Sequence, residues 1–359
     1  MGSTSTTSTS TRWTRITCTH RAERCCSPPF GYLPVDASRY WFITFNTVAI
    51  LLAAYFLLRL FKFSLASVAA PALLLAMFCT ESVTSTLVFT NINGCILLGE
   101  VLFLRWLLSG KVGHEWLAGA AIGLTLVVKP SLAPLLLLPV LNRQWRALVP
   151  AFGGAAAVQR RRVATGQRPD GIRAQHRAVH PLGARLLQQL DPGQRDLLRP
   201  AVVADPAAAG DLPGPCGRSL WLLYRYYRER DQLFWMVTSS GVLLIATFLV
   251  TSLGQGYYSM MLFPFLMSVV LPNSVIRNWV AWLAIYGFMT MDRWLLIHWL
   301  TTGRFLEYMK ITYGWSLMLV VVFCVLYFRY LDAKADGRLD DGIDPPWMTT
   351  DRDRASVER

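Results

Sequence analysis

The chain has 359 residues, 53% of them hydrophobic, and its mean hydropathy is +0.37. Soluble domains are usually about 45–50% apolar, so the composition excludes an ordinary soluble domain and predicts an integral membrane protein. The net charge of +13 does not indicate a nucleic-acid partner, because Lys and Arg stand at the ends of apolar runs, as in membrane proteins. The seven cysteines show no metal-ligand spacing, so we expect neither a metal nor a cofactor.

Composition divides the chain into five parts. Residues 1–29 are rich in Ser, Thr and Arg, whereas residues 30–158 are a succession of apolar runs. Residues 159–217 contain no Phe, Tyr, Trp, Lys, Asn, Met, Ser or Glu. Apolar runs return over residues 218–332, and residues 333–359 are a charged tail that we expect in the cytoplasm. This pattern predicts an all-α fold, a polytopic transmembrane helix bundle in two parts.

The first part contains four predicted spans, which are residues 40–60, 64–78, 92–108 and 116–128. Glu81 to Asn93 is predicted as a polar loop. Lys129-Pro130 ends the fourth span, and residues 132–141 are too short for a span of about 20 residues, so they predict a half-helix. Residues 148–158 begin a further span and do not complete it.

The second part predicts four more spans, which are residues 233–253, 258–271, 279–291 and 313–330. Asp292 to Thr312 is predicted as an amphipathic loop or an interfacial helix. When the basic clusters at the span ends are placed in the cytoplasm, every span alternates without conflict. The outer face of the plasma membrane then collects a set of polar residues: Glu81, Asn91, Asn93, Lys129, Gln255, Tyr257, Tyr258, Asp292 and His298.

Lys129 is the first candidate among these residues, because it lies beside a proline at the boundary of an apolar run. Such a lysine either extends its ammonium group to the lipid headgroups or binds a phosphate as a point charge. Asn91 and Asn93 can bind sugar hydroxyls, but their segment also has the composition of a turn. Gln255 and Tyr257 are further candidates for sugar or lipid contacts.

Three acidic residues are weaker candidates for proton transfer. Glu81 and Asp292 each follow an apolar run, and a solvated loop residue is the alternative for Glu81. Glu100 lies within a predicted span, where a charged side chain is costly unless it is paired or lines a cavity. His298 is either a general base or an interfacial residue on an amphipathic segment.

Four stretches of the sequence resemble one family of membrane enzymes. They are Phe30-Gly31-Tyr32-Leu33-Pro34, Asn91-Ile92-Asn93-Gly94, Gly119 to Lys129-Pro130, and Arg143-Gln144-Trp145-Arg146. They are similar to the polyprenyl-phosphate-dependent GT-C glycosyltransferases of actinobacterial cell walls (the GT87, DUF2029-like group). Within this family the arabinofuranosyltransferases are the nearest group, and the polyprenol-phosphate-mannose mannosyltransferases are the alternative.

The resemblance implies a multi-span fold and transfer of arabinofuranose from a polyprenyl-phosphate donor to cell-wall arabinan at the extracytoplasmic face. It leaves the catalytic residue unknown, because the family's aspartate, in an outer loop after a first span, has no counterpart in this sequence. The resemblance therefore predicts a GT-C-like helix bundle that is truncated at its N-terminus. A membrane transporter or lipid-binding protein without chemistry is the rival class. Transporter repeats show matched broken segments, and the second half contains no partner for Lys129-Pro130.

Residues 1–29 and 159–217 have a common explanation. Back-translated and shifted by one base, the first stretch can read through a Tyr-Pro-Pro segment like that of the family, directly into residue 27. Shifted the other way, the second stretch can begin Phe-Asn-Ala-Ala-Ala-Trp-Pro and complete the unfinished span. We therefore interpret both stretches as out-of-frame translation and expect the chain to be inactive. A disordered tail and a disordered loop are the alternative.

Overall fold

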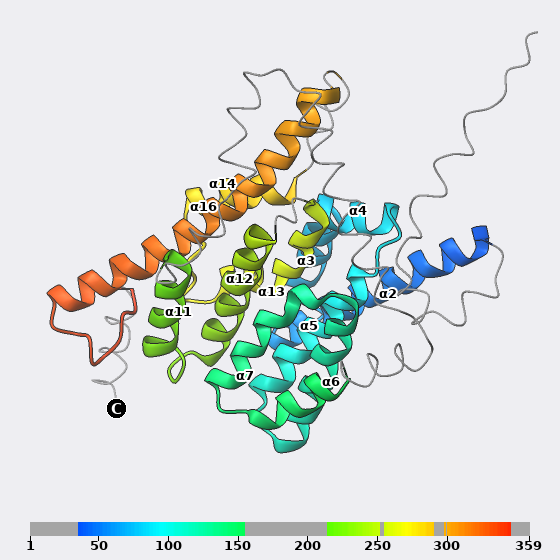
Figure 1. The fold of residues 1–359 in the computed structure, drawn as a ribbon. Helices are drawn as coiled ribbons and strands as arrows, with labels where there is room; N and C mark the ends of the chain where they lie inside the picture. Colours follow the sequence, from blue (N-terminus) through cyan, green and yellow to red (C-terminus); the bar gives the residue numbers. More distant parts are fainter. Residues whose placement is uncertain (1–34, 155–213, 252–254, 291–297, 299, 346–359) are drawn as a thin grey trace, which may run out of the picture.

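The computed structural model describes residues 35–154, 214–251, 255–290, 298 and 300–345. Within these ranges the chain forms helices and no strand, as the sequence predicts (Figure 1). Three of the helical segments, Ala37–Leu60, Gln232–Val250 and Met309–Ala335, are long and apolar enough to cross a membrane. The fold is therefore an all-α membrane helix bundle.

The first half of the bundle is built around α5. Its elements are α2 (Val35–Leu60), α3 (Ala69–Phe78), α4 (Glu81–Val88), α5 (Asn93–Leu108), α6 (Val112–Val128), the 3₁₀ helix η4 (Pro130–Leu136), α7 (Leu137–Leu141) and η5 (Trp145–Ala147). Helix α5 packs against α2 on one side and against α6 on the other. Both contacts depend on glycines, since a Cβ on Gly94 would lie 2.7 Å from the Asn46 backbone oxygen and one on Gly99 2.4 Å from Thr125.

The second half is built around α12. Its elements are α11 (Pro215–Tyr226), α12 (Gln232–Val250), η7 (Gly256–Leu262), α13 (Phe263–Met267), η8 (Ser268–Val270), α14 (Trp279–Met289) and α16 (Leu300–Ala335). Helix α12 contacts α11, α16 and η7, and it also contacts η4 and α5 of the first half, so it joins the two halves. This position explains why 72% of its apolar stretch is buried, against 39% for each of the other two long helices.

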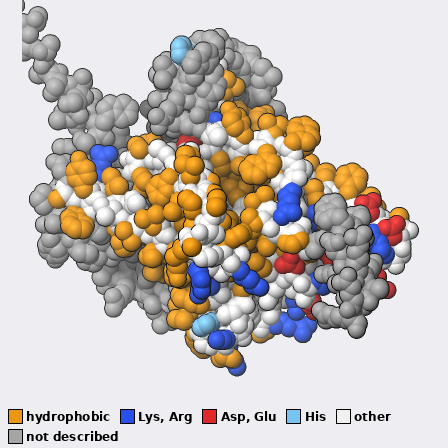
Figure 2. Space-filling view, turned by 180° about the vertical axis from the view of Figure 1, so that it is seen from behind, with side chains coloured by type: hydrophobic (Ala, Val, Ile, Leu, Met, Phe, Trp, Pro, Cys, Tyr) orange, Lys and Arg blue, Asp and Glu red, His pale blue; other side chains and the backbone are white. Residues whose placement is uncertain are grey.

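The long helix α16 runs along one side of the bundle (Figure 1). On the opposite side, one end of α2 projects beyond the rest of the bundle. Hydrophobic side chains spread over much of the described surface on the face drawn in Figure 2. Large apolar side chains such as Tyr40, Trp41 and Trp279 are more than half exposed. A helix surface of this kind is unstable in water and suits contact with lipid.

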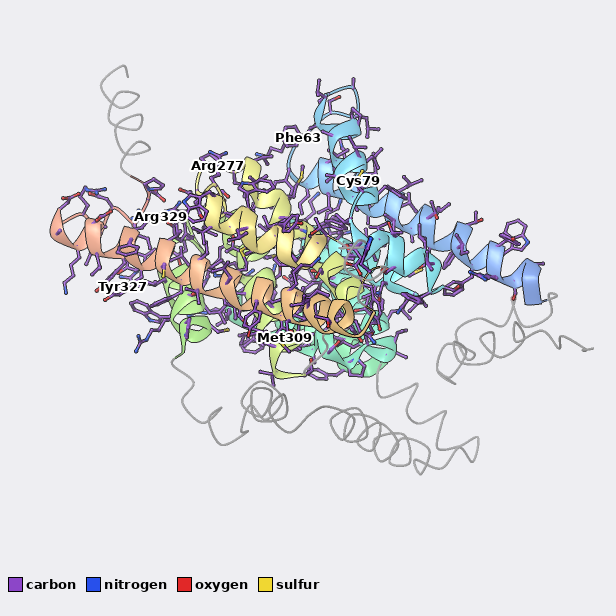
Figure 3. All side chains as sticks on the ribbon, turned by 90° about the horizontal axis from the view of Figure 1, so that it is seen from above. Phe63, Cys79, Arg277, Met309, Tyr327 and Arg329 are labelled. Carbon is purple, nitrogen blue, oxygen red and sulfur yellow. The ribbon has the colours of Figure 1, made fainter. Side chains whose placement is uncertain are left out.

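A hydrogen-bond network ties α16, the segment between η8 and α14, and the start of α12 together. The Arg329 guanidinium of α16 donates to the backbone oxygens of Asn273 and Ser274 at 2.8 and 2.9 Å. Asn273 in turn donates to Asp231, whose carboxylate also caps α12 by accepting the Phe234 N–H at 3.0 Å. In Figure 3, Arg277 and Arg329 lie toward one end of α16 and Met309 toward the other. Arg277 and Arg329 thus lie at the same end of the bundle, whereas Lys310 of α16 lies beside Met309 toward the other.

Several predicted segments differ from the structure. The predicted loop from Glu81 to Asn93 begins with the helix α4, whose small residues Ser82, Ser85 and Thr86 are buried against neighbouring elements. Residues 64–78 do not form one span, because α3 starts only at Ala69 and the chain bends by 59° between α3 and α4. The bend lies at Thr80, which has an extended backbone, and its hydroxyl donates back to the Met77 carbonyl at 2.7 Å.

Two further expectations in the second half are corrected. Residues 258–271 form the three short elements η7, α13 and η8 instead of one span, and Pro264 supplies no N–H to continue a helix ladder at that point. The segment expected to be a loop or an interfacial helix up to Thr312 belongs from Leu300 onward to α16.

Asp292 lies outside the described residues. The half-helix expected over residues 132–141 is confirmed, since η4 and α7 together form a short broken segment.

Candidate active site

Residues from both halves of the bundle meet where α4, α5 and η7 begin and α6 ends. We call this place the Lys129 rim and define it by six residues: Glu81, Asn93, Lys129, Gly256, Tyr257 and Tyr258. Helix α4 packs against η7, and so does α5. Four of the residues selected from the sequence, which are Glu81, Asn93, Lys129 and Tyr257, are thus brought together from segments as far as 176 positions apart.

The backbone at Lys129 follows from its neighbour. A proline disfavours the helical conformation in the residue before it, and Lys129 has φ −130° and ψ 89°, so α6 ends at Val128. The side chain leaves the helix end and points into the bundle, where its Nζ donates to the side-chain oxygen of Asn93. The same ammonium group lies 4.2 Å from the ring centroid of Tyr258 and 5.2 Å from that of Tyr257. Aromatic faces attract cations at such distances.

Asn93 holds the lysine from a fully buried position. Its amide nitrogen lies 3.4 Å from the Thr86 hydroxyl and 3.4 Å from the Tyr257 backbone oxygen, so it joins α4, α5 and η7. Its oxygen accepts from Lys129. Because Asn93 is fully buried, this geometry fixes the direction of the lysine and leaves little of the amide to face a ligand.

Asn46 of α2 supports this arrangement from the other side of α5. The N-cap position of α5, Ile92, has no side chain that could cap the helix. The Asn46 side-chain oxygen accepts the Gly94 N–H at 3.2 Å, while its amide donates to Phe42 within α2 at 3.1 Å. A residue from a neighbouring helix therefore satisfies one of the free N–H groups at the start of α5.

Glu81 lies beside Gly256. It is the first residue of α4, and its carboxyl carbon and Oε1 both lie 3.4 Å from the position that a Gly256 Cβ would take. Ile311 of α16 lies 3.5 Å from the same position. The start of a helix favours a negative charge, because the peptide dipoles point their positive ends there. The rim therefore presents a carboxylate beside Gly256 and an ammonium group beside the rings of Tyr257 and Tyr258.

The remaining candidates have other surroundings. Asn91 is half-buried in the turn before α5, with its N–H donating to the Thr86 carbonyl at 2.9 Å, and Gln255 is exposed immediately before η7. His298 is exposed, and no described segment links it to the rim. Tyr258 was not among the residues selected for the site. Because it is adjacent to the candidate Tyr257 in the sequence, the pair of tyrosines was a signal that could have identified it. Its ring stacks on Tyr257 at 4.7 Å and packs on Phe248 at 5.7 Å.

Glu100 is buried seven residues, or two helical turns, below Asn93 on α5. Its side chain is 0% exposed, and neither carboxyl oxygen has a hydrogen-bond partner within the described ranges. The ion pair with Lys or Arg considered from the sequence is therefore not found among the residues that the structure describes. Glu100 is therefore not among the residues that define the Lys129 rim.

Comparison with known proteins connects this geometry to a family. A family model described as glycosyltransferase family 87 matches residues 27–159. A protein of Mycolicibacterium smegmatis named alpha-(1->3)-arabinofuranosyltransferase is 66% identical to the chain, covering 92% of this chain and 76% of its own length. Proteins of the same name from Mycobacterium tuberculosis and Corynebacterium glutamicum are 60% and 33% identical, covering 90% and 92% of this chain and 75% and 78% of their own. No solved structure matches the chain.

The identity with the first two relatives extends over nine-tenths of the chain, well beyond the segment that the family model matches. That segment contains α2 to α6, and with them Glu81, Asn93 and Lys129 of the rim. The helical membrane fold, the rim and these relatives agree, and the chain belongs to glycosyltransferase family 87.

Proposed function

We propose that the protein transfers arabinofuranose from a polyprenyl-phosphate donor to a hydroxyl group of cell-wall arabinan, at the extracytoplasmic face of the plasma membrane. The observation that carries the proposal is the Lys129 ammonium group, directed into the rim by Asn93 and faced by two tyrosine rings. The name of the relatives supports arabinofuranose over the mannose alternative.

The proposed reaction exchanges one bond at the anomeric carbon. The acceptor oxygen forms a bond to this carbon while the bond from the carbon to the phosphate oxygen breaks, and the phosphate leaves with the electron pair. A cation at the leaving oxygen lowers the barrier because it stabilises charge that grows in the transition state. We assign this role to Lys129, with Asn93 as the residue that positions it.

The other polar residues of the rim are assigned supporting contacts. The Tyr257 ring is half-buried beside the lysine and can face the donor sugar or the first unit of its prenyl chain. Asn91 and Gln255 precede α5 and η7 on neighbouring segments, and we assign them to sugar hydroxyls. The proton acceptor for the incoming hydroxyl is left unassigned in this chain.

Binding of a prenyl phosphate tests the role of Lys129 without turnover. The full chain in phosphatidylcholine nanodiscs is titrated with farnesyl phosphate, and binding is followed by tryptophan fluorescence. We expect Lys129→Met to weaken binding ten- to a hundredfold, since a hydrogen bond to a charged group contributes about 1.5–3 kcal/mol. Inorganic phosphate, titrated in parallel, separates recognition of the prenyl compound from recognition of any phosphate.

Lys111→Met is the matched control, because Lys111 is also adjacent to a terminus of α6, at its start, and is exposed. This variant should bind farnesyl phosphate like the unmodified chain. Equal affinity in Lys129→Met, at equal abundance in the nanodisc, would show that Lys129 only anchors the helix end near the headgroups.

We also propose that residues 1–29 and 159–217 are translated out of frame and that the chain as written is inactive. The match to the family model supports this, since it runs from residue 27 to residue 159, the edges of the two unusual stretches. Residues 1–29 and 159–213 lie outside the described residues, whereas residues 214–217 are described and include the start of α11.

A further inference from the structure

The two charged groups of the Lys129 rim lie beside one short segment, residues 256–258. Lys129 faces the rings of Tyr257 and Tyr258, and Glu81 lies against Gly256, the residue before them. Consecutive Cα atoms are about 3.8 Å apart, so Gly256 and Tyr258 are separated by at most about 7 Å along the chain. A single small molecule placed over this segment can therefore reach both groups.

The surroundings of Glu81 suit a neutral sugar. A carboxylate only accepts hydrogen bonds and has room for several, so it is complementary to neighbouring hydroxyl groups, which donate them. The start of α4 favours its negative charge. The apolar side chain of Ile311 lies 3.5 Å from the Cβ position of Gly256, and such groups pack against the C–H faces of a sugar ring.

The fold fixes Glu81 in this place. The bend at Thr80 directs the first turn of α4 toward η7, and the Ser82 hydroxyl contacts the sulfur of Met289 at 3.7 Å. The Glu81 carboxyl is half-buried, and its Oε2 atom is shielded from solvent. The backbone at Glu81 is fixed by these neighbours, which limits the positions of its carboxyl group and lowers the entropic cost of positioning a ligand.

From these contacts we infer that Glu81 forms an acceptor subsite that binds the hydroxyl groups of a furanoside, separate from the phosphate subsite at Lys129. This inference rests on the proposed function, which supplies the sugar class. It assigns Glu81 to binding of the acceptor, and it requires no catalytic step in this chain.

Two ligands and two variants test the inference on the full chain. The chain is titrated with methyl α-arabinofuranoside and, separately, with farnesyl phosphate. Glu81→Gln should weaken furanoside binding ten- to a hundredfold, because the bonds to a charged acceptor are lost, and should leave the affinity for farnesyl phosphate within twofold. Lys129→Met should show the reverse pattern.

Glu115→Gln is the matched control, since Glu115 is likewise in the first turn of a helix, α6, away from the rim. Glu81→Asp keeps the charge on a shorter side chain and should bind the furanoside with intermediate affinity. Thermal unfolding of each variant checks that the fold is retained.

The outcomes separate the two proposals. Equal loss of both ligands in Glu81→Gln, loss of neither, or no furanoside binding by the unmodified chain would overturn the acceptor subsite. In each of these cases a selective loss of farnesyl phosphate in Lys129→Met still supports the proposed function. Loss of furanoside binding in Glu81→Gln with no effect of Lys129→Met on farnesyl phosphate would retain a sugar site and remove the phosphate assignment.

Discussion

At the scale of single residues, the direction of the Lys129 side chain favours one of the two interpretations that the sequence leaves open. A lysine that reaches the headgroups extends away from the bundle. Here Nζ turns inward to a fully buried asparagine and two aromatic rings. Burying part of the ammonium group costs free energy, which Asn93 and the two rings offset in part, and a phosphate ligand would offset it further; this favours the binding role.

Glu100 allows the first stability prediction. Its carboxyl group is fully buried without a hydrogen-bond partner in the described parts of the chain, and such a group costs about 1–3 kcal/mol. We expect Glu100→Met, which keeps the length of the side chain, to raise the midpoint of thermal unfolding in detergent. Glu115→Met, at a partly exposed position, should change it little. A lower midpoint for Glu100→Met would show that the carboxyl has a function or a partner that stabilises the fold.

The sequence predicted the charged residues of the site better than the residues that support them. Lys129 and Glu81 are visible because a polar residue at the boundary of an apolar run stands out. Asn46 lies in the middle of a span and looks like a helix residue. Its role appears only when α2 packs on α5, because its partner Gly94 is 48 positions away. Such a contact depends on the packing of two helices, which local sequence does not encode.

At the scale of elements, the start of α5 controls the geometry of the rim. A Cβ on Gly94 would lie 2.7 Å from the Asn46 backbone oxygen and 2.9 Å from its side-chain oxygen. Gly94→Ala must therefore push α2 and α5 apart and shift the neighbouring Asn93. We expect a destabilisation of about 1–3 kcal/mol, as is usual for overpacking, together with weaker binding of farnesyl phosphate.

Gly113→Ala is the control for this prediction. Gly113 lies in the first turn of α6, and nothing lies within 4 Å of its Cβ position. Alanine has a higher helix propensity than glycine, so this variant should be as stable as the unmodified chain or more stable. Thermal unfolding and phosphate binding are measured for both variants. Unchanged values in Gly94→Ala would show that the start of α5 is loose and does not position Asn93.

Element lengths were the weaker part of the sequence-based prediction. Hydropathy identified α2, α12 and the final helix correctly, since each is a long apolar run. It failed over residues 64–93 and 258–271, where buried Ser, Thr and Gly residues allow helices to break inside the bundle. Hydropathy counts such residues as polar or neutral, whereas here they pack in tight contacts with neighbouring elements.

At the scale of the whole molecule, the proposed orientation places the Lys129 rim outside the cell. Single cysteines are introduced at Val88 and Val112, both more than half exposed, in a background whose seven cysteines are replaced by serine. Val88 lies at the end of α4 near the rim, and Val112 lies at the opposite end of α6. A membrane-impermeant maleimide should label position 88 in intact cells and position 112 only after permeabilisation. The reverse pattern would move the rim to the cytoplasm.

The last prediction concerns activity and the two unusual stretches. In lipid, each backbone polar group without a partner costs several kcal/mol, so residues 159–217, rich in Arg and Pro, cannot complete the span that residues 148–158 begin. We therefore expect arabinofuranose transfer from a lipid-phosphate donor only from a version with both frames corrected, compared with this chain at equal abundance in membranes.

Correcting one stretch at a time identifies which of the two corrections is required for activity. Lys129→Met in the corrected version should lower turnover ten- to a hundredfold. Equal activity in the chain as written would refute the frame interpretation, and Glu81, at the rim, would then become the first candidate for the catalytic base.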